Sequence, residues 1–207
     1  MKDFGGRVTE VHSGDSLTIE RESDLKALRV FLSSVKAPSM TGNRENGKEP
    51  QPEPYAWESK ESLRKLAIGK RVRVEMEYDR VVPTRQGQEM TMSFGAVTDQ
   101  QKNRNFAVYQ LERGLLKTNV RHSGENASKY LEDLLAAEKK AADGKLCLHN
   151  QSKQPPVQVF ADLLSNTKQA KEYEHMVMGR KDKTFKGVVE YCFSGMKFKV
   201  RLDSEGR

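Results

Sequence analysis

The side chains suited to proton transfer or metal binding are scattered along this chain of 207 residues. Its histidines form no pair with the spacing of metal ligands, and they are His12, His122, His149 and His175. Cys147 and His149 stand close together, but a packed cysteine at a domain edge explains that pair better than a catalytic dyad does. No glycine-rich phosphate-binding loop is present, so we predict no metal ion and no histidine- or cysteine-based catalysis.

Basic side chains are the stronger chemical signal. The 36 Lys and Arg residues outnumber 29 Asp and Glu residues, which gives a net charge of +7 and attraction to polyanions. Arg71 and Arg73 share one strand face, so their charges lie about 7 Å apart, near the phosphate spacing of a nucleic-acid strand. Pairing with Glu75 remains an alternative for them, as does a salt bridge or a free surface position for Lys36. The candidate nucleic-acid contacts are Arg29, Lys36, Lys70, Arg71, Arg73, Arg85 and Arg121.

Hydrophobic spacing predicts the elements that position these residues. Two short apolar runs joined through Gly14 and Asp15 predict a β-hairpin, and a third strand follows at 28–32. Ser-Gly-Asp is favourable turn chemistry, so Asp15 suits a turn with or without a bound cation. Residues 41–54 hold three prolines and no apolar residue, and we expect a mobile loop there.

Helices and further strands follow that loop. Helical spacing runs from Pro54 to Gly69, and alternation then predicts strands at 71–77 and 90–98. Asn105 and Gly114 are expected to bound a short helix, with an extended piece at 115–120. A longer helix is expected after Asn126, with an apolar stripe formed by Tyr130, Leu131, Leu134, Leu135 and Ala141. Helical spacing also assigns five aromatic residues to the core, namely Tyr55, Trp57, Phe106, Tyr109 and Tyr130.

The chain contains an internal repeat. Residues 6–14 match 187–195 at an offset of 181, and the match continues at two further apolar pairs. We therefore predict a whole domain over 1–150, a linker with a helix over 151–185, and the first hairpin of a following, truncated repeat over 186–207. A chance likeness between two hairpins is the alternative.

Composition excludes several classes of protein. Mean hydropathy is -0.77, no apolar run approaches bilayer length, and the first residues form no secretion signal. Two cysteines without a spacing pattern indicate a reducing compartment, cytosolic or nuclear. A membrane protein, a disulfide scaffold and a structural zinc site are disfavoured.

The order of elements and several local motifs resemble the staphylococcal nuclease fold. The matching segments are the hairpin around Ser13-Gly14-Asp15, then Val35-Lys36-Ala37-Pro38, the helix from Pro54 to Lys65, and Tyr130 to Ala141. The resemblance implies a mainly β fold with packed helices, a five-stranded OB-type barrel, followed here by a linker helix and a β-hairpin.

The resemblance extends to the multi-repeat Tudor staphylococcal nuclease family. Residues 159–162, 168–171 and 188–195 are similar to the connection between the third and fourth repeats of that family. Family membership would imply RNA binding, a place in RNA silencing complexes or transcriptional coactivation, and a cytoplasmic, also nuclear, location.

Bacterial staphylococcal nuclease hydrolyses phosphodiesters with Ca²⁺, carboxylates and two arginines. By resemblance, its five catalytic positions fall on Asp15, Phe31, Lys36, Ser39 and Met92. Only Asp15 keeps its chemistry, and Lys36 places a cation at a metal-ligand position. The loss of one transition-state donor alone costs about 10²–10³ in rate, so we expect no catalysis and no cofactor in this domain.

Three functions stay open at the level of sequence. The first is an inactive nuclease-like domain that binds RNA, which we expect to be double-stranded or structured because few aromatic residues are free to stack. The second is a protein-interaction scaffold. The third is a part of a calcium-dependent endoribonuclease whose active site lies in other repeats.

Overall fold

The protein is described by a computed structural model, which covers residues 3–42, 51–83, 87, 89–119, 127–150, 152, 154–155, 157, 163, 167–179 and 184–202. The chain divides into two compact units, an N-terminal unit of Met1–Gln158 and a C-terminal unit of Val159–Arg207.

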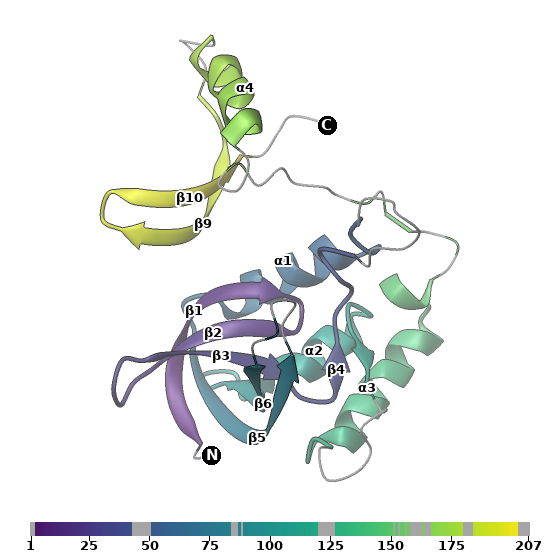
Figure 1. Cartoon of the computed structure of the whole chain (residues 1–207). Helices are drawn as coiled ribbons and strands as arrows, with labels where there is room; N and C mark the ends of the chain where they lie inside the picture. Colours follow the sequence, from purple (N-terminus) through teal and green to yellow (C-terminus); the bar gives the residue numbers. More distant parts are fainter. Residues whose placement is uncertain are drawn as a thin grey trace. The chain divides into compact units, whose positions relative to one another are not determined.

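A closed ring of five strands forms the centre of the N-terminal unit (Figure 1). Its strands are β1 (Phe4–Ser13), β2 (Ser16–Arg21), β3 (Ala27–Leu32), β5 (Arg71–Pro83) and β6 (Glu89–Asp99). Neighbouring strands pair in antiparallel fashion, except that β3 pairs with β6 in parallel. That parallel pair closes the ring and leaves the barrel without a free edge. The predicted five-stranded, OB-type barrel is confirmed.

Three short strands extend this framework. β4 (Val35–Lys36) pairs with β8 (Lys117–Thr118) in antiparallel fashion, and β7 (Arg104–Asn105) pairs with the end of β6. The β4–β8 pair lies where the sequence indicated only the end of a strand and an extended piece.

Three helices of the N-terminal unit contribute residues to the barrel core, namely α1 (Ala56–Ala67), α2 (Phe106–Glu112) and α3 (Leu131–Asp143). The short 3₁₀ helix η2 (Cys147–His149) follows α3 and has no buried residue. Asn105 caps α2 as predicted, since its side chain accepts a hydrogen bond from the backbone N–H of Ala107 at 2.9 Å. Within the described residues, no helix combines the length and apolar character needed to cross a membrane.

Two predictions about the core are wrong. Leu135 is 41% exposed, because the buried stripe of α3 runs through Leu134, Ala137 and Ala141. Of the five aromatic residues assigned to the core, only Phe106 is buried among the described core residues. Phenol hydroxyls need partners, and the Tyr130 hydroxyl donates to Glu75 at 3.0 Å at the barrel surface.

The C-terminal unit contains α4 (Thr167–Met178), β9 (Gly187–Ser194) and β10 (Lys197–Leu202). β9 and β10 form an antiparallel hairpin in the predicted position.

Candidate nucleic-acid interface

Asp15 ties the β1–β2 turn to two other segments of the barrel. One carboxylate oxygen accepts from the Ser13 hydroxyl at 2.6 Å, and the other accepts from the backbone N–H of Ala37 at 2.9 Å. The Asp15 carbonyl accepts from the N–H of Leu32 at 2.8 Å. The end of β3 and the residue after β4 therefore meet at this turn.

The other four positions that the resemblance matches to the nuclease catalytic residues lie on β3, β4 and β6 and in the segment after β4. Phe31 is the cross-strand partner of Ser16, next to Asp15, and Lys36 precedes Ala37 with its side chain exposed. Ser39 is held by Glu53, whose carboxylate accepts from the Ser39 backbone N–H at 2.7 Å. Met92 lies on β6 as the cross-strand partner of Arg80.

These residues do not fit a calcium ion. Ca²⁺ takes six to eight oxygen ligands in proteins. Here both carboxylate oxygens of Asp15 already accept hydrogen bonds, and Lys36 offers an ammonium group. No cluster of three or more acidic, histidine or cysteine side chains suited to a metal occurs within the described part of the chain.

Two lysines stand opposite each other beside the Asp15 turn. Lys36 of β4 and Lys117 of β8 are direct cross-strand partners, and both are exposed. Like charges placed directly opposite destabilise an antiparallel pair. Neither lysine forms an ion pair with any residue that the structure describes. Their charges are therefore available to an anionic partner.

The remaining predicted cations are in different settings. Arg71 lies 3.6 Å from Glu22, and Arg73 lies 3.3 Å from Glu75, so each has a carboxylate neighbour. Lys70 is half-buried. Arg29 donates to the Ser16 hydroxyl at 3.3 Å and lies over the ring of Phe31. Arg85 and Arg121 lie outside the described residues.

Glu75 is the centre of an ionic contact between the barrel and α3. It is buried, accepts hydrogen bonds from Lys129 and from the Tyr130 hydroxyl, and forms an ion pair with Arg73 at 3.3 Å. The hydrogen bond from Lys129 is the main reason that the pKa of Glu75 is lowered. Burial acts in the opposite direction, while the Tyr130 hydroxyl and the charges of Lys129 and Arg73 lower the pKa further. This contact binds Arg73 to the scaffold and makes it a poor ligand for phosphate.

His12 is partly buried beside the site. Its Nε2 atom lies 2.7 Å from the Thr18 hydroxyl, and its Nδ1 atom lies 3.5 Å from Glu10. Burial lowers the pKa of His12, and Glu10 acts in the opposite direction. The lysines and arginines are therefore the main source of local positive charge.

Sequence reasoning missed a cluster of aromatic rings beside this site. Phe31 of β3, Phe94 of β6 and Tyr78 of β5 are in contact, with Arg29 and Arg80 over two of the rings. The alternation of residues in β3 was a partial signal. It places Phe31 on the outer face of the strand, while its neighbours Val30 and Leu32 lie on the buried face. No local pattern could have indicated its partner Phe94, which a parallel strand pairing brings alongside.

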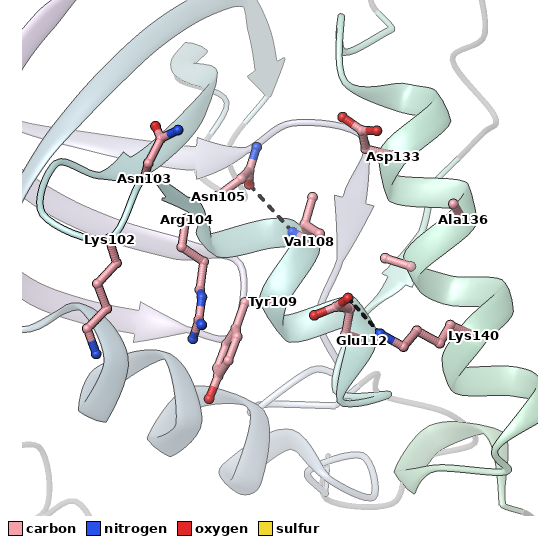
Figure 2. Close-up of a pocket in the computed structure, with 11 residues that line it drawn as sticks. Lys102, Asn103, Arg104, Asn105, Val108, Tyr109, Glu112, Asp133, Ala136 and Lys140 are labelled. Atoms are coloured by element: carbon pink, nitrogen blue, oxygen red, sulfur yellow. Dashed lines mark hydrogen bonds and ion pairs between the residues drawn. The ribbon is translucent and has the colours of Figure 1, made fainter.

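A hollow lies between α2 and α3 (Figure 2). It has a volume of about 430 Å³ and mixes both signs of charge, with Lys140 3.1 Å from Glu112. Arg104 and Arg113 lie over the Tyr109 ring at 4.7 and 5.5 Å. Because its charges are balanced in part, this hollow is less suited to a polyanion than the Lys36–Lys117 pair.

Comparison with known proteins places these features in a family context. No family model matches the chain. It is similar to Ribonuclease TUDOR 2 of Arabidopsis thaliana, with 32% identity over 229 residues, covering 99% of the chain and 23% of the relative. Ribonuclease TUDOR 1 of the same plant is 33% identical over 235 residues, covering 97% of the chain and 23% of the relative.

The similarity also reaches an animal protein. Staphylococcal nuclease domain-containing protein 1 of Drosophila melanogaster is 26% identical over 219 residues, covering 96% of the chain and 22% of the relative. The chain thus spans less than a quarter of the length of these relatives. Over that segment, the chain is homologous to the Tudor staphylococcal nuclease proteins and corresponds to one of their staphylococcal nuclease-like repeats.

Proposed function

We propose that this chain is a catalytically degenerate nuclease-like module that binds RNA within a longer protein. The observation that carries this proposal is the Lys36–Lys117 pair, two exposed cations in direct opposition with no ion pair among the described residues. Their mutual repulsion is relieved when a phosphate lies near both. The names of the relatives, as ribonucleases, support RNA as the polyanion.

The residues of the same site also support the loss of nuclease activity. Asp15 serves the fold, since it accepts hydrogen bonds that join β1–β2 to the segment after β4. Phe31 supplies no donor for a developing negative charge, and Ser39 supplies no carboxylate base. A calcium-dependent ribonuclease activity of the whole protein would then belong to other repeats.

Fluorescence anisotropy of a labelled RNA tests the binding proposal. We expect micromolar affinity at about 50 mM salt that falls steeply by 200 mM, as phosphate contacts require. The double variant Lys36→Glu, Lys117→Glu should weaken binding, and the slope of log K against log salt should fall by about two.

The matched control changes net charge by the same amount elsewhere. Lys139→Glu, Lys145→Glu replaces two exposed lysines at the end of α3 and after it. An equal loss of affinity in this control would mean that only overall charge matters, and no local site exists. Cleavage of RNA in Ca²⁺ that disappears in Asp15→Ala would contradict the degenerate site.

A protein-interaction scaffold is the second candidate, and the C-terminal hairpin favours it. Phe193 and Met196 are 47% and 93% exposed, and Phe193 stands at the position equivalent to His12, outside the inner apolar face of the repeat. An apolar docking surface would show little salt dependence, which separates the two candidates. Partners from RNA silencing or transcription, and a cytoplasmic or nuclear location, are proposals that rest on the family resemblance.

A further inference from the structure

We propose that the outer face of β3, β5 and β6 is a base-stacking site for single-stranded RNA. The site is the ring cluster of Phe31, Phe94 and Tyr78 with the flanking Arg29 and Arg80. This inference rests on the proposed function, because it names the form of RNA that the same region of the barrel binds.

The three rings form a continuous aromatic surface across three strands. Tyr78 and Phe94 are stacked, with centroids 4.8 Å apart and planes at 14°. Phe31 and Phe94 are 5.5 Å apart with planes tilted by 35°. Such a surface matches the face of a nucleobase, since every base presents a π-face whatever its identity.

The ring cluster lies on the outside of the barrel. Val30 and Leu32 are 0% and 1% exposed, so the intervening Phe31 points away from the core. Ser93 and Gly95 are buried on either side of Phe94, which is half-buried. The described hydrophobic core is built from other residues. The three rings therefore lie outside the described buried core of the barrel.

Arginine side chains lie over two of the three rings. The guanidinium carbon of Arg29 lies 4.9 Å from the Phe31 centroid, and that of Arg80 lies 5.5 Å from the Phe94 centroid. Neither arginine has an ion-pair partner among the described residues. A phosphate that draws either guanidinium off its ring would leave that ring face free for a base, and this combination of arginine and aromatic ring is typical of single-strand binding proteins.

The ring cluster favours single-stranded over double-stranded RNA. Bases in a duplex are already stacked on each other and present no free face to a protein ring. The sequence favoured a duplex because its aromatic residues were expected in the core. The outward position of Phe31 and Phe94 removes that reason.

Anisotropy with a labelled 10-nucleotide RNA, single-stranded or as a duplex, tests the inference. We expect the double variant Phe31→Leu, Phe94→Leu to lose about tenfold or more in affinity for the single strand, since one stacked base contributes about 1–3 kcal/mol. Duplex binding should change by less than about twofold, and the salt slope should not change, because no charge is removed.

Two further variants keep the test decisive if leucine disturbs the barrel. Phe31→Tyr, Phe94→Tyr keeps both rings and should retain binding to the single strand. Tyr109→Leu removes a ring at the α2–α3 hollow (Figure 2), over which Arg104 and Arg113 lie, and should leave binding unchanged. Loss of binding in Tyr109→Leu, or equal loss for duplex and single strand in the leucine double variant, would overturn the inference.

The outcome also distinguishes this inference from the proposed function. No binding of either RNA at 50 mM salt would refute RNA binding by the chain altogether. Salt-dependent binding that the leucine double variant leaves intact would refute stacking alone.

Discussion

The first and last hairpins of this chain have the same register. In β1–β2, Gly6, Val8 and Val11 face Arg21, Ile19 and Leu17. In β9–β10, the equivalent Gly187, Val189 and Cys192 face Leu202, Val200 and Phe198. Both ladders are interrupted at the same two steps. The internal repeat seen in the sequence is therefore a repeat in backbone structure.

The two hairpins differ in burial. Val8 and Ile19 are 1% and 0% exposed, whereas their equivalents Val189 and Val200 are 55% and 46% exposed. The same apolar pattern is thus covered by a barrel in one copy, and in the other copy no described residue of its own unit covers it. An apolar pattern specifies a hairpin and its intended inner face, and only partner strands bury that face.

Two pairs of equivalent glycines show which close contacts arise within the hairpin and which arise only from the barrel. A Cβ on Gly6 would lie 2.5 Å from the Glu20 carbonyl oxygen, and one on Gly187 would lie 2.8 Å from the equivalent oxygen of Arg201. This requirement is internal to the hairpin. In contrast, a Cβ on Gly14 would lie 1.8 Å from the Ser59 hydroxyl of α1, while Gly195 has open space around it.

Asp15 is likewise required by the barrel and not by the hairpin turn itself. Met196 is its equivalent, and it is 93% exposed in a turn that forms without a carboxylate. Since the turn does not need Asp15, the value of this residue in the barrel lies in its bond to the Ala37 N–H.

The largest expected effect on stability comes from substitution of the turn glycine Gly14. Gly14→Ala should lower the free energy of unfolding by about 3 kcal/mol, because the new methyl group displaces Ser59, whose hydroxyl donates to the Leu115 carbonyl. Urea unfolding followed by fluorescence of Trp57, the single tryptophan, measures it. Gly195→Ala is the matched control and should stay within about 0.5 kcal/mol. Equal effects at both glycines would refute the contrast.

The paired valines give the next largest effect. Val8→Ala removes two buried methyl groups and should cost about 2 kcal/mol, through lost burial and the cavity left behind. Val189→Ala, at the equivalent position, should leave the Trp57 transition unchanged. Hydrogen exchange of the peptide spanning β9 and β10 should change little in this variant. Strong deprotection there would show that Val189 is covered in solution, and the comparison would fail.

The smallest effect concerns the ionic contact of the barrel with α3, an element that the second hairpin does not provide. Glu75→Gln should cost about 1 kcal/mol at pH 7, since it leaves Lys129 and Arg73 without a charged partner. The pKa of Glu75 is lowered in the folded state, so its contribution is full above the ordinary carboxyl pKa of about 4.3 and is lost as pH falls through the lowered value.

Urea midpoints at pH 7, 4 and 3 measure this dependence. The difference between the native protein and Glu75→Gln should shrink steadily on acidification. Glu112→Gln, which loses the exposed contact with Lys140, should show little difference at any of these pH values. A Glu75 effect that does not depend on pH would mean that side-chain shape, and not charge, holds α3.

Local residue order determined the elements of this protein. Alternating apolar residues, Asn105 at a helix start and Gly69 at φ +73° after α1 each act through neighbours in the chain. The hairpin repeat could also be recognised from the sequence, because register in a tight hairpin depends on a few adjacent residues.

The tertiary structure decided which surface side chains lie together. The parallel pairing of β3 with β6 brings Phe31 to Phe94, and the pairing of β4 with β8 places Lys36 opposite Lys117. These partners are distant in the chain, so no local spacing encodes their contact. Closure of the barrel selects the partners, since burial of the core and pairing of every strand edge allow few arrangements.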